Sequence, residues 1–379
     1  MIKKILKPVY RNIKKPFKKL RVFLKQKAGW LGIPKILPYR GFGDNSGVFI
    51  KGMVIEDKGL AEPADRHRVW HNTLAMIKRF ASDEIPGVRV RADFLGISQI
   101  SETDEDGFFS FHFDVSGISD TVLKKHWHTV EFELLDTVVD DQPETTATGT
   151  VRIVSPEEER IIVSDIDDTI LISHATQTVR KLRLMLFKNA LTRLPFKGIT
   201  AFYRALEKGD DKNSHYPFFY VSSSEWNLYD LLVNFFGHND IPRGVFMLRK
   251  LESSIYKFWK SGQGSHEHKY DKIKFLLLFY KTQKFILIGD SGQKDPQIYD
   301  RLAHDFPGRI ETIYIRKIGS KSYFKNIEQV NSRLEKVNTS YLQVEDTWEA
   351  ARHALENGYI NREVIEEFSR EKDPDLVTF

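Results

Sequence analysis

The stretch that decides the fold is IIVSDIDDT, which covers residues 161–169. Its apolar start is typical of a strand that is buried on both faces of a sheet. Asp165, Asp167 and Asp168 then put three carboxylates within four residues. Like charges this close repel one another and raise one another's pKa unless a cation lies among them. The stretch therefore indicates a buried strand that ends at a site for a hard divalent cation, and Mg²⁺ suits one or two carboxylates combined with waters and a phosphate.

Further apolar runs follow this one and alternate with helical segments. Continuous apolar strands separated by helices predict an α/β fold, with a parallel sheet covered by helices on both faces. In such sheets ligands bind beyond the carboxyl ends of the strands, so the residues just after each strand are candidates for a site. The predicted strands are Ile161–Val163, Phe218–Val221, Val245–Leu248, Phe285–Ile288 and Thr312–Ile315.

Polar residues stand after the second and the fourth of these strands. The second strand leads into the serines 222–224, whose hydroxyls suit phosphate oxygens. For Ser223 and Ser224 individually, we expect helix capping as the role. The fourth strand leads into Asp290 and Asp295, which supply two more carboxylates. Lys269 opens the helix before that strand and can neutralise an anionic substrate.

The order of these residues resembles the four motifs of the haloacid dehalogenase-like superfamily. The motif residues are Asp165, Asp167 and Thr169 in Asp-x-Asp-x-Thr, then Ser222, then Lys269, and then Asp290 and Asp295 in Gly-Asp-x-x-x-x-Asp. The resemblance implies a Rossmannoid parallel sheet for this part of the chain. A lone Asp-x-Asp would be a weak signal, whereas four motifs at the ends of the correct strands are a strong one.

Longer stretches narrow the resemblance. Residues 220–231, the pair His268-Lys269 and residues 285–296 resemble the catalytic domain of the actin-patch-protein-type Mg²⁺-dependent phosphatidate phosphatases. The similarity covers about residues 159–320. Glu225 stands where the family pattern has proline, which concerns the start of a helix more than the chemistry.

The family resemblance implies a role for each catalytic carboxylate. Asp165 attacks phosphorus and forms an aspartyl-phosphate, a covalent route that needs no cysteine. Asp167 protonates the leaving alkoxide and then activates the water that hydrolyses this intermediate. An aspartate at position 167 also favours a phosphatase over dehalogenation or phosphonate cleavage.

The same resemblance implies the residues that bind metal and phosphate. Mg²⁺ is held by Asp165, by the backbone carbonyl of Asp167 and by Asp290. The substrate phosphate is bound by Ser222, Lys269 and Thr169. Asp295 orients metal ligands or metal-bound waters from behind them.

Residues 41–158 follow a different pattern, in which apolar and polar residues alternate. This alternation, with turn residues between the runs, predicts antiparallel strands and a small β-sandwich. The alternating runs are Val88–Phe94, Phe109–Val115 and Val130–Leu134, and one helix is expected around Val69–Phe80.

Composition divides the chain of 379 residues further. Residues 1–40 contain thirteen Lys and Arg and no Asp or Glu, so the net charge of +5 combines a basic arm with a body of −8. Apolar residues recur in the arm at helical spacing, and a basic amphipathic segment suits an anionic membrane surface. A nucleic-acid role rests on the same charges, but the apolar face counts against it, and a solubilising or docking arm remains an alternative. The absence of cysteine excludes disulfides, thiolate zinc sites and cysteine nucleophiles.

The spacing of the motifs leaves no room for a folded cap domain over the site. An open site suits a headgroup presented by a membrane better than a small metabolite, because nothing closes to exclude water. Residues 178–193 and 255–260 mix basic with apolar or aromatic residues and are candidate membrane contacts, or helices packed on the sheet.

We therefore expect a Mg²⁺-dependent phosphatidate phosphatase, cytoplasmic and peripheral on a membrane, that converts phosphatidic acid to diacylglycerol. Its expected partners are an anionic phospholipid surface and the lipid substrate, without nucleic acid. The alternatives are another exposed phosphomonoester (lysophosphatidate, phosphatidylglycerol phosphate or a nucleic-acid end) and an inactive membrane-tethering module. The expected organisation is an arm (1–40), a β-sandwich-like domain (41–158), a haloacid dehalogenase-like phosphatase domain without a large cap (159–340) and a helical segment (341–379), with a helix at Thr347–Leu355.

Overall fold

The computed structural model describes residues 30–57, 83–166, 170, 198–210, 214–249, 268–318 and 327–363. The chain divides into two compact units between Ile153 and Val154. Several predictions lie outside the described residues and stay predictions. They concern most of the basic arm, the helix around Val69–Phe80, the segments 178–193 and 255–260, and the missing cap.

The first unit is rich in β-structure, as the alternating pattern predicts. Its elements are β1 (Pro34–Pro38), β2 (Gly41–Gly43), β3 (Gly47–Glu56), β4 (Arg89–Phe94), β5 (Ile97–Glu102), β6 (Phe108–Asp114), α3 (Asp120–Leu123), β7 (Trp127–Leu134) and β8 (Thr146–Ile153). In this part of the chain the strands join in one sheet of order β1-β3-β2-β8-β7-β4-β5, with β6 also paired to β3. Because the strands form one continuous sheet, the two-layered sandwich itself stays a prediction.

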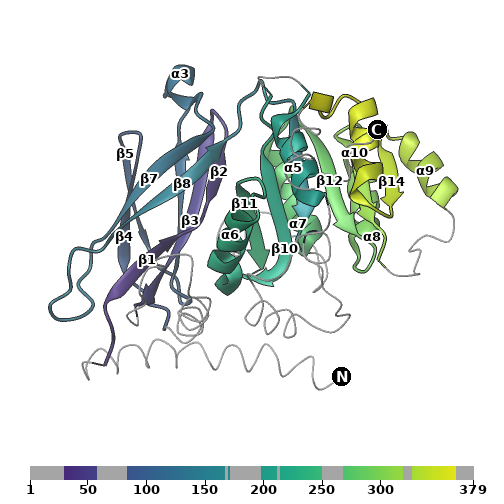
Figure 1. Ribbon diagram of the computed structural model, residues 1–379. Helices are drawn as coiled ribbons and strands as arrows, with labels where there is room; N and C mark the ends of the chain where they lie inside the picture. The colour runs from purple at the N-terminus through teal and green to yellow at the C-terminus, as the bar shows by residue number, and fades with distance from the viewer. Residues whose placement is uncertain are drawn as a thin grey trace. The chain divides into compact units, whose positions relative to one another are not determined.

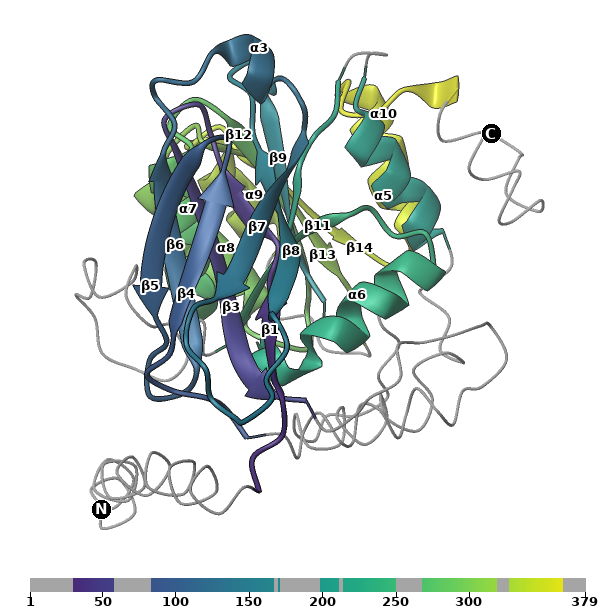
Figure 2. The same cartoon turned by 90° about the vertical axis from the view of Figure 1, so that its left-hand side faces the viewer.

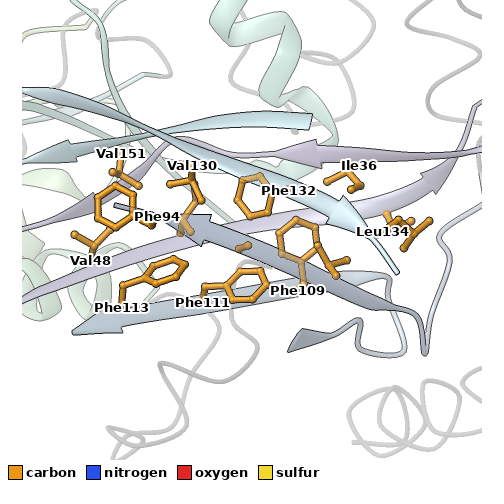
Figure 3. Packing of buried hydrophobic residues seen from close by; sticks show 14 of the residues in the cluster. Ile36, Val48, Phe94, Phe109, Phe111, Phe113, Val130, Phe132, Leu134 and Val151 are labelled. Atoms are coloured by element: carbon orange, nitrogen blue, oxygen red, sulfur yellow. The ribbon is translucent and has the colours of Figure 1, made fainter. Parts of the chain in front are cut away.

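Aromatic and aliphatic side chains together fill the interior of this unit (Figure 3). Phe109, Phe111 and Phe113 alternate along β6 and are at most 3% exposed, and Phe132 of β7 packs 5.4 Å from Phe109 between ring centroids. Burial of such a side chain contributes about 1.5–3 kcal/mol. Residues 34–38, which the charge pattern assigned to the end of the arm, form β1, because the side chain of Ile36 joins this core.

The second unit contains a parallel sheet. Its strands are β9 (Arg160–Asp165), β10 (Phe218–Glu225), β11 (Gly244–Arg249), β12 (Lys284–Asp290), β13 (Ile310–Arg316) and β14 (Ser340–Val344). Among the described residues they follow the order β11-β10-β9-β12-β13-β14, and every neighbouring pair is parallel. All five predicted strands are confirmed. The edge strand β14 was not predicted.

Helices cover both faces of this sheet (Figures 1 and 2). One face carries α5 (Ile199–Lys208), α6 (Tyr229–His238) and α10 (Thr347–Glu356), and α10 packs on α5. The other face carries α7 (His268–Phe279), α8 (Asp295–Asp305) and α9 (Ile327–Glu335), which pack side by side. The predicted helix near the C-terminus is confirmed as α10, whose first turn is capped by Asp346. None of the helices in the described ranges combines the length and the apolar character needed to cross a bilayer.

The strand order reverses beside β9. The chain runs from β9 to β10 and β11 on one side, and then returns to β12, β13 and β14 on the other side. At such a switch point the connections leave in opposite directions and open a crevice at the carboxyl ends of the two central strands. Those two strands end at Asp165 and Asp290.

The amino end of β9 is held by a compact charged clamp. The Arg160 guanidinium donates from Nε to Glu311 at 2.7 Å and from Nη1 to the Tyr216 hydroxyl at 2.8 Å. It also lies over the rings of Tyr216 and Tyr359, at 5.6 and 5.2 Å from their centroids. Burial alone would lower the pKa of Arg160, but Glu311 holds it above its usual range. This end of the strand is therefore fixed by a matched pair of charges.

Arg309 holds the C-terminal end of α7. Its guanidinium donates to the carbonyls of Leu277 at 3.2 Å, of Gln283 at 2.9 Å and of Tyr280. The last carbonyls of a helix lack partners within the helix, so a cation there satisfies them and complements the helix dipole. Arg309 thus anchors the helix whose first turn contains Lys269.

Candidate active site

Three carboxylates meet at the carboxyl end of the parallel sheet. Asp165 ends β9, Asp290 ends β12, and Asp295 is the first residue of α8. All three residues are 0% exposed, and one carboxylate oxygen from each lies within 4.8 Å of the others. Burying three like charges together costs free energy unless cations compensate them. The cluster is therefore a candidate cation site.

Lys269 supplies one positive charge to this cluster from the first turn of α7. Its Nζ donates to Asp165 Oδ1 at 2.9 Å and also to Asp295 Oδ1, and the residue is 6% exposed. Burial by itself would lower the pKa of Lys269, but Asp165 and then Asp295 hold that pKa well above its usual range. The ammonium therefore stays charged at any physiological pH.

A tight turn orients the Asp290 carboxylate. Its Oδ1 accepts from the backbone N–H of Gly292 at 2.7 Å and of Gln293 at 3.0 Å. The next residue, Ser291, donates its backbone N–H to the Arg316 carbonyl at 2.9 Å, which ties the turn to β13. Two backbone N–H donors thus fix one oxygen of this carboxylate.

Asp295 lies behind this turn. Its Oδ2 accepts from the backbone N–H of Asp290 at 3.4 Å, and Pro296 follows it in the first turn of α8. The positive end of the helix dipole favours a carboxylate at this position. Close approach also requires glycine at 289, because a Cβ there would lie 2.6 Å from Asp295 Oδ2.

A chain of hydroxyls holds the backbone of Asp165. The Ser164 hydroxyl donates to the Asp165 carbonyl at 2.7 Å, and the Tyr203 hydroxyl from α5 lies 2.7 Å from Ser164 Oγ. Burial raises the pKa of Tyr203 well above its usual range, so its hydroxyl keeps its proton and remains a donor. The chain fixes Asp165 from the face of the sheet opposite to Lys269.

Ser222 follows Val221, the last residue of β10 that pairs with β9, where its partner is Asp165. The Ser222 hydroxyl accepts from the backbone N–H of Ser224 at 2.9 Å, and its carbonyl accepts from Lys272 Nζ at 3.1 Å. Ser222 therefore lies one residue beyond the level of Asp165 on the neighbouring strand.

The predicted capping role of Ser223 and Ser224 is wrong. Both residues lie within β10, which continues to Glu225, and a 3₁₀ turn at Trp226–Leu228 follows. The helix α6 begins at Tyr229 and has no side-chain cap. The strand is longer than predicted because it pairs again with β11 after an irregularity in the ladder.

The structure thus brings four of the predicted motif residues into one cluster: Asp165, Lys269, Asp290 and Asp295. Ser222 lies on the strand next to Asp165. Asp167 and Thr169 lie outside the described residues, so their roles stay predictions.

Sequence reasoning missed three further polar side chains at this edge: Tyr203, Lys272 and Arg316. Burial lowers the pKa of Arg316, which sits beside Asp290 in the ladder and donates to the Thr347 hydroxyl at 3.4 Å. Arg316 directly follows the predicted strand Thr312–Ile315, so the expectation that site residues stand just after strands could have identified it. Lys272 lies one helical turn after Lys269, whereas no local signal points to Tyr203.

Residues 160–317 match the family described as phosphatidate phosphatase APP1, catalytic domain. This segment of the chain is therefore similar to that family. The matched residues run from β9 to the end of β13 and include every described residue of the carboxylate cluster.

Two curated relatives extend the similarity beyond this segment. Phosphatidate phosphatase APP1 of Saccharomyces cerevisiae is 28% identical over 244 residues, which is 63% of this chain and 40% of that protein. An uncharacterised protein of Schizosaccharomyces pombe is 26% identical over 327 residues, or 80% of this chain and 50% of its own length. The chain thus spans half or less of the length of either relative.

Similarity to solved structures is slight. A structure of a bacterial ice-binding adhesin aligns over 37% of this chain and 40% of its own, with 9% identity and a TM-score of 0.21. A likeness this small supports no argument about fold or function.

Proposed function

We propose that residues 159–340 form a haloacid dehalogenase-like phosphatase domain that hydrolyses phosphatidic acid to diacylglycerol and phosphate. The observation that carries the proposal is the buried cluster of Asp165, Asp290 and Asp295 around Lys269. It lies at the switch point of the sheet, where α/β proteins bind ligands, within the segment that matches a phosphatidate phosphatase family.

The donor set of the cluster suits Mg²⁺. Asp165, Asp290 and Asp295 offer carboxylate oxygens, which hard divalent cations prefer, and their three charges exceed the one charge that Lys269 brings to them. We propose that Asp165 and Asp290 hold the ion together with the backbone carbonyl of Asp167. When bound, Mg²⁺ would neutralise charge on the substrate phosphate. Asp295 then helps to position Asp290, because it accepts a hydrogen bond from the backbone N–H of that residue.

The first chemical step is assigned to Asp165. Its carboxylate attacks phosphorus, an aspartyl-phosphate bond forms, and the phosphorus–oxygen bond to diacylglycerol breaks. Attack requires an ionised carboxylate, and the ammonium of Lys269 lies 2.9 Å from Asp165 Oδ1. Asp167 gives a proton to the departing alkoxide oxygen.

The second step returns the enzyme to its initial state. Asp167, now ionised, takes a proton from water as the water attacks phosphorus, and inorganic phosphate leaves Asp165. Ser222, Thr169 and Lys269 bind the equatorial oxygens of the phosphate while charge builds on them. Lys269 suits this role because its neighbouring carboxylates keep it protonated.

Membrane association is proposed for the basic arm. Residues 1–29 contain eleven Lys and Arg and no acidic residue, and they lead into Trp30, which is 77% exposed. Each basic residue near an anionic surface contributes about 1 kcal/mol at most before screening, and tryptophan favours the membrane–water interface.

The deciding experiment measures phosphate release from a panel of lipid and soluble phosphomonoesters in mixed micelles, with Mg²⁺ and after chelation. We expect the highest kcat/KM for phosphatidic acid and no turnover without the metal ion. A higher kcat/KM for lysophosphatidate, phosphatidylglycerol phosphate or a nucleic-acid end would assign that compound as the substrate instead of phosphatidic acid. Absence of turnover on every substrate would leave an inactive tethering module.

A chain that begins at Trp30 tests the arm while keeping β1. We expect it to hydrolyse a short-chain soluble phosphatidate at the wild-type rate, and to lose rate on phosphatidate-containing vesicles. The wild-type advantage on vesicles should vanish toward 1 M salt, where the Debye length is about 3 Å. An equal loss on both substrates would mean that the arm packs on the fold instead.

A further inference from the structure

The strand β10 leaves its regular ladder at Ser222. On one side, its pairing with β9 ends at Val221 opposite Asp165. On the other side, its pairs with β11 step from Val221↔Met247 to Glu225↔Arg249, so four residues of β10 advance against two of β11. Such bulges re-aim side chains and occur often beside active sites.

Lys272 contacts the backbone at this bulge. Its Nζ donates to the Ser222 carbonyl at 3.1 Å, across 50 positions of sequence, and both residues are buried, at 6% and 1% exposure. A buried carbonyl that leaves a β-ladder needs another donor. An ammonium is a strong one, because a hydrogen bond to a charged group contributes about 1.5–3 kcal/mol.

The hydroxyl of Ser222 is oriented by the same bulge. Its oxygen accepts from the backbone N–H of Ser224 at 2.9 Å, so its own hydrogen points elsewhere and is suited to donation to a phosphate oxygen. The carbonyl contact with Lys272 and the hydroxyl contact with Ser224 together fix one residue from two sides.

We infer that Lys272 is a positioning residue for phosphate binding, which rests on the proposed function of the site. Lys272 pins the Ser222 carbonyl and so holds the Ser222 hydroxyl toward the substrate phosphate. One helix, α7, then serves both halves of the site, because Lys269 reaches the carboxylates from the same face one turn earlier.

The test compares Lys272→Met with the control Lys274→Met, a lysine of the same helix that lies over the Tyr270 ring at 5.7 Å. For Lys272→Met we expect KM and the dissociation constant of inorganic phosphate from the Mg²⁺-loaded protein to rise about 10- to 100-fold, the equivalent of one such hydrogen bond. We expect kcat to change much less. Lys272→Arg should restore most of the affinity, and Lys274→Met should match wild type.

A second background shows whether Lys272 acts through Ser222. In Ser222→Ala protein, Lys272→Met should weaken phosphate binding no further, since the group it positions is gone. Additive losses, or unchanged phosphate binding in Lys272→Met, overturn the inference. If Lys272→Met does not fold, Lys272→Gln is the substitute, because it is polar but too short to reach the carbonyl. Calorimetric phosphate binding decides these outcomes even if the protein hydrolyses none of the tested substrates, so the inference and the proposed function can fail separately.

Discussion

The two ends of the parallel sheet treat charge in opposite ways. At the amino end, the Arg160 guanidinium meets the Glu311 carboxylate, and Lys284 and Glu159 add one further charge of each sign. Aromatic rings lie against the guanidinium. At the carboxyl end, three buried carboxylates gather around the ammonium of Lys269. A matched pair with completed hydrogen bonds stabilises the fold, whereas a cluster of like charges costs stability and is expected where a ligand binds. Substitutions at the two ends should therefore separate stability from activity.

The largest effect is expected for Asp165→Asn. Loss of the nucleophile should lower kcat by at least about 10³-fold. The free energy of unfolding should not fall, because one of three crowded negative charges disappears while Lys269 keeps Asp295. Phosphate release and urea denaturation measure the two quantities, and full activity in this variant would rule out the assigned nucleophile.

The opposite result is expected for Arg160→Met at the other end of the sheet. Glu311 would lose its closer cationic partner and keep Lys284 at 3.3 Å, and Tyr216 would lose a charged donor, so the free energy of unfolding should fall by about 2–4 kcal/mol. The kcat of the folded protein should stay at the wild-type value, since the clamp lies at the end of β9 away from Asp165. Glu311→Gln is the matched control from the other side of the pair, and an equal loss of kcat would contradict the separation of the two ends.

Metal binding sharpens the comparison. If the cluster binds Mg²⁺ only in the folded protein, a concentration 100 times the dissociation constant should stabilise wild type by about 2.7 kcal/mol. Thermal unfolding with and without Mg²⁺ should show this shift in Arg160→Met and not in Asp290→Asn. A full shift in Asp290→Asn would remove Asp290 from the metal site.

The smallest effect is expected for Arg309→Met. The carbonyl of Leu277 in α7 and those of Tyr280 and Gln283 just after it would lose a charged donor, so unfolding should become easier by about 1–2 kcal/mol. KM should stay near wild type because Lys269 lies at the far end of the helix. A large rise in KM would show that the C-terminal anchor of α7 controls the position of its first turn.

Sequence alone predicted the parallel sheet well because burial on both faces leaves continuous apolar runs, as in Ile161–Val163, each at 0% exposure. The search for polar residues just after each strand then predicted that Asp165, Asp290 and Asp295 lie together, since parallel strands bring their carboxyl ends to one edge of the sheet. The edge strand β14 was missed because its residues are only partly buried, and its run is short and half polar.

Other features depend on tertiary packing and leave no local pattern. Tyr203 reaches Ser164 from a helix 39 positions away, and Lys272 reaches Ser222 across 50. Ser223 and Ser224 were expected to cap a helix because serine is a common cap, but the bulged strand β10 resumes pairing at Glu225 and carries them with it. The capping propensity of serine describes only a local preference, and pairing of β10 in the sheet outweighs it for Ser223 and Ser224.

The long sequence separation between the residues of the carboxylate cluster has a consequence for synthesis of this protein on the ribosome. Lys269 meets Asp165 across 104 positions of sequence, and Asp295 must also emerge before the cluster is complete. A growing chain that contains β9, β10 and β11 thus already exposes Asp165 without its neutralising lysine. Chains lengthen at about 5–20 residues per second, and contacts so distant in sequence form late. The nascent protein should therefore spend several seconds with β9, β10 and β11 already synthesised and the carboxylate cluster still incomplete.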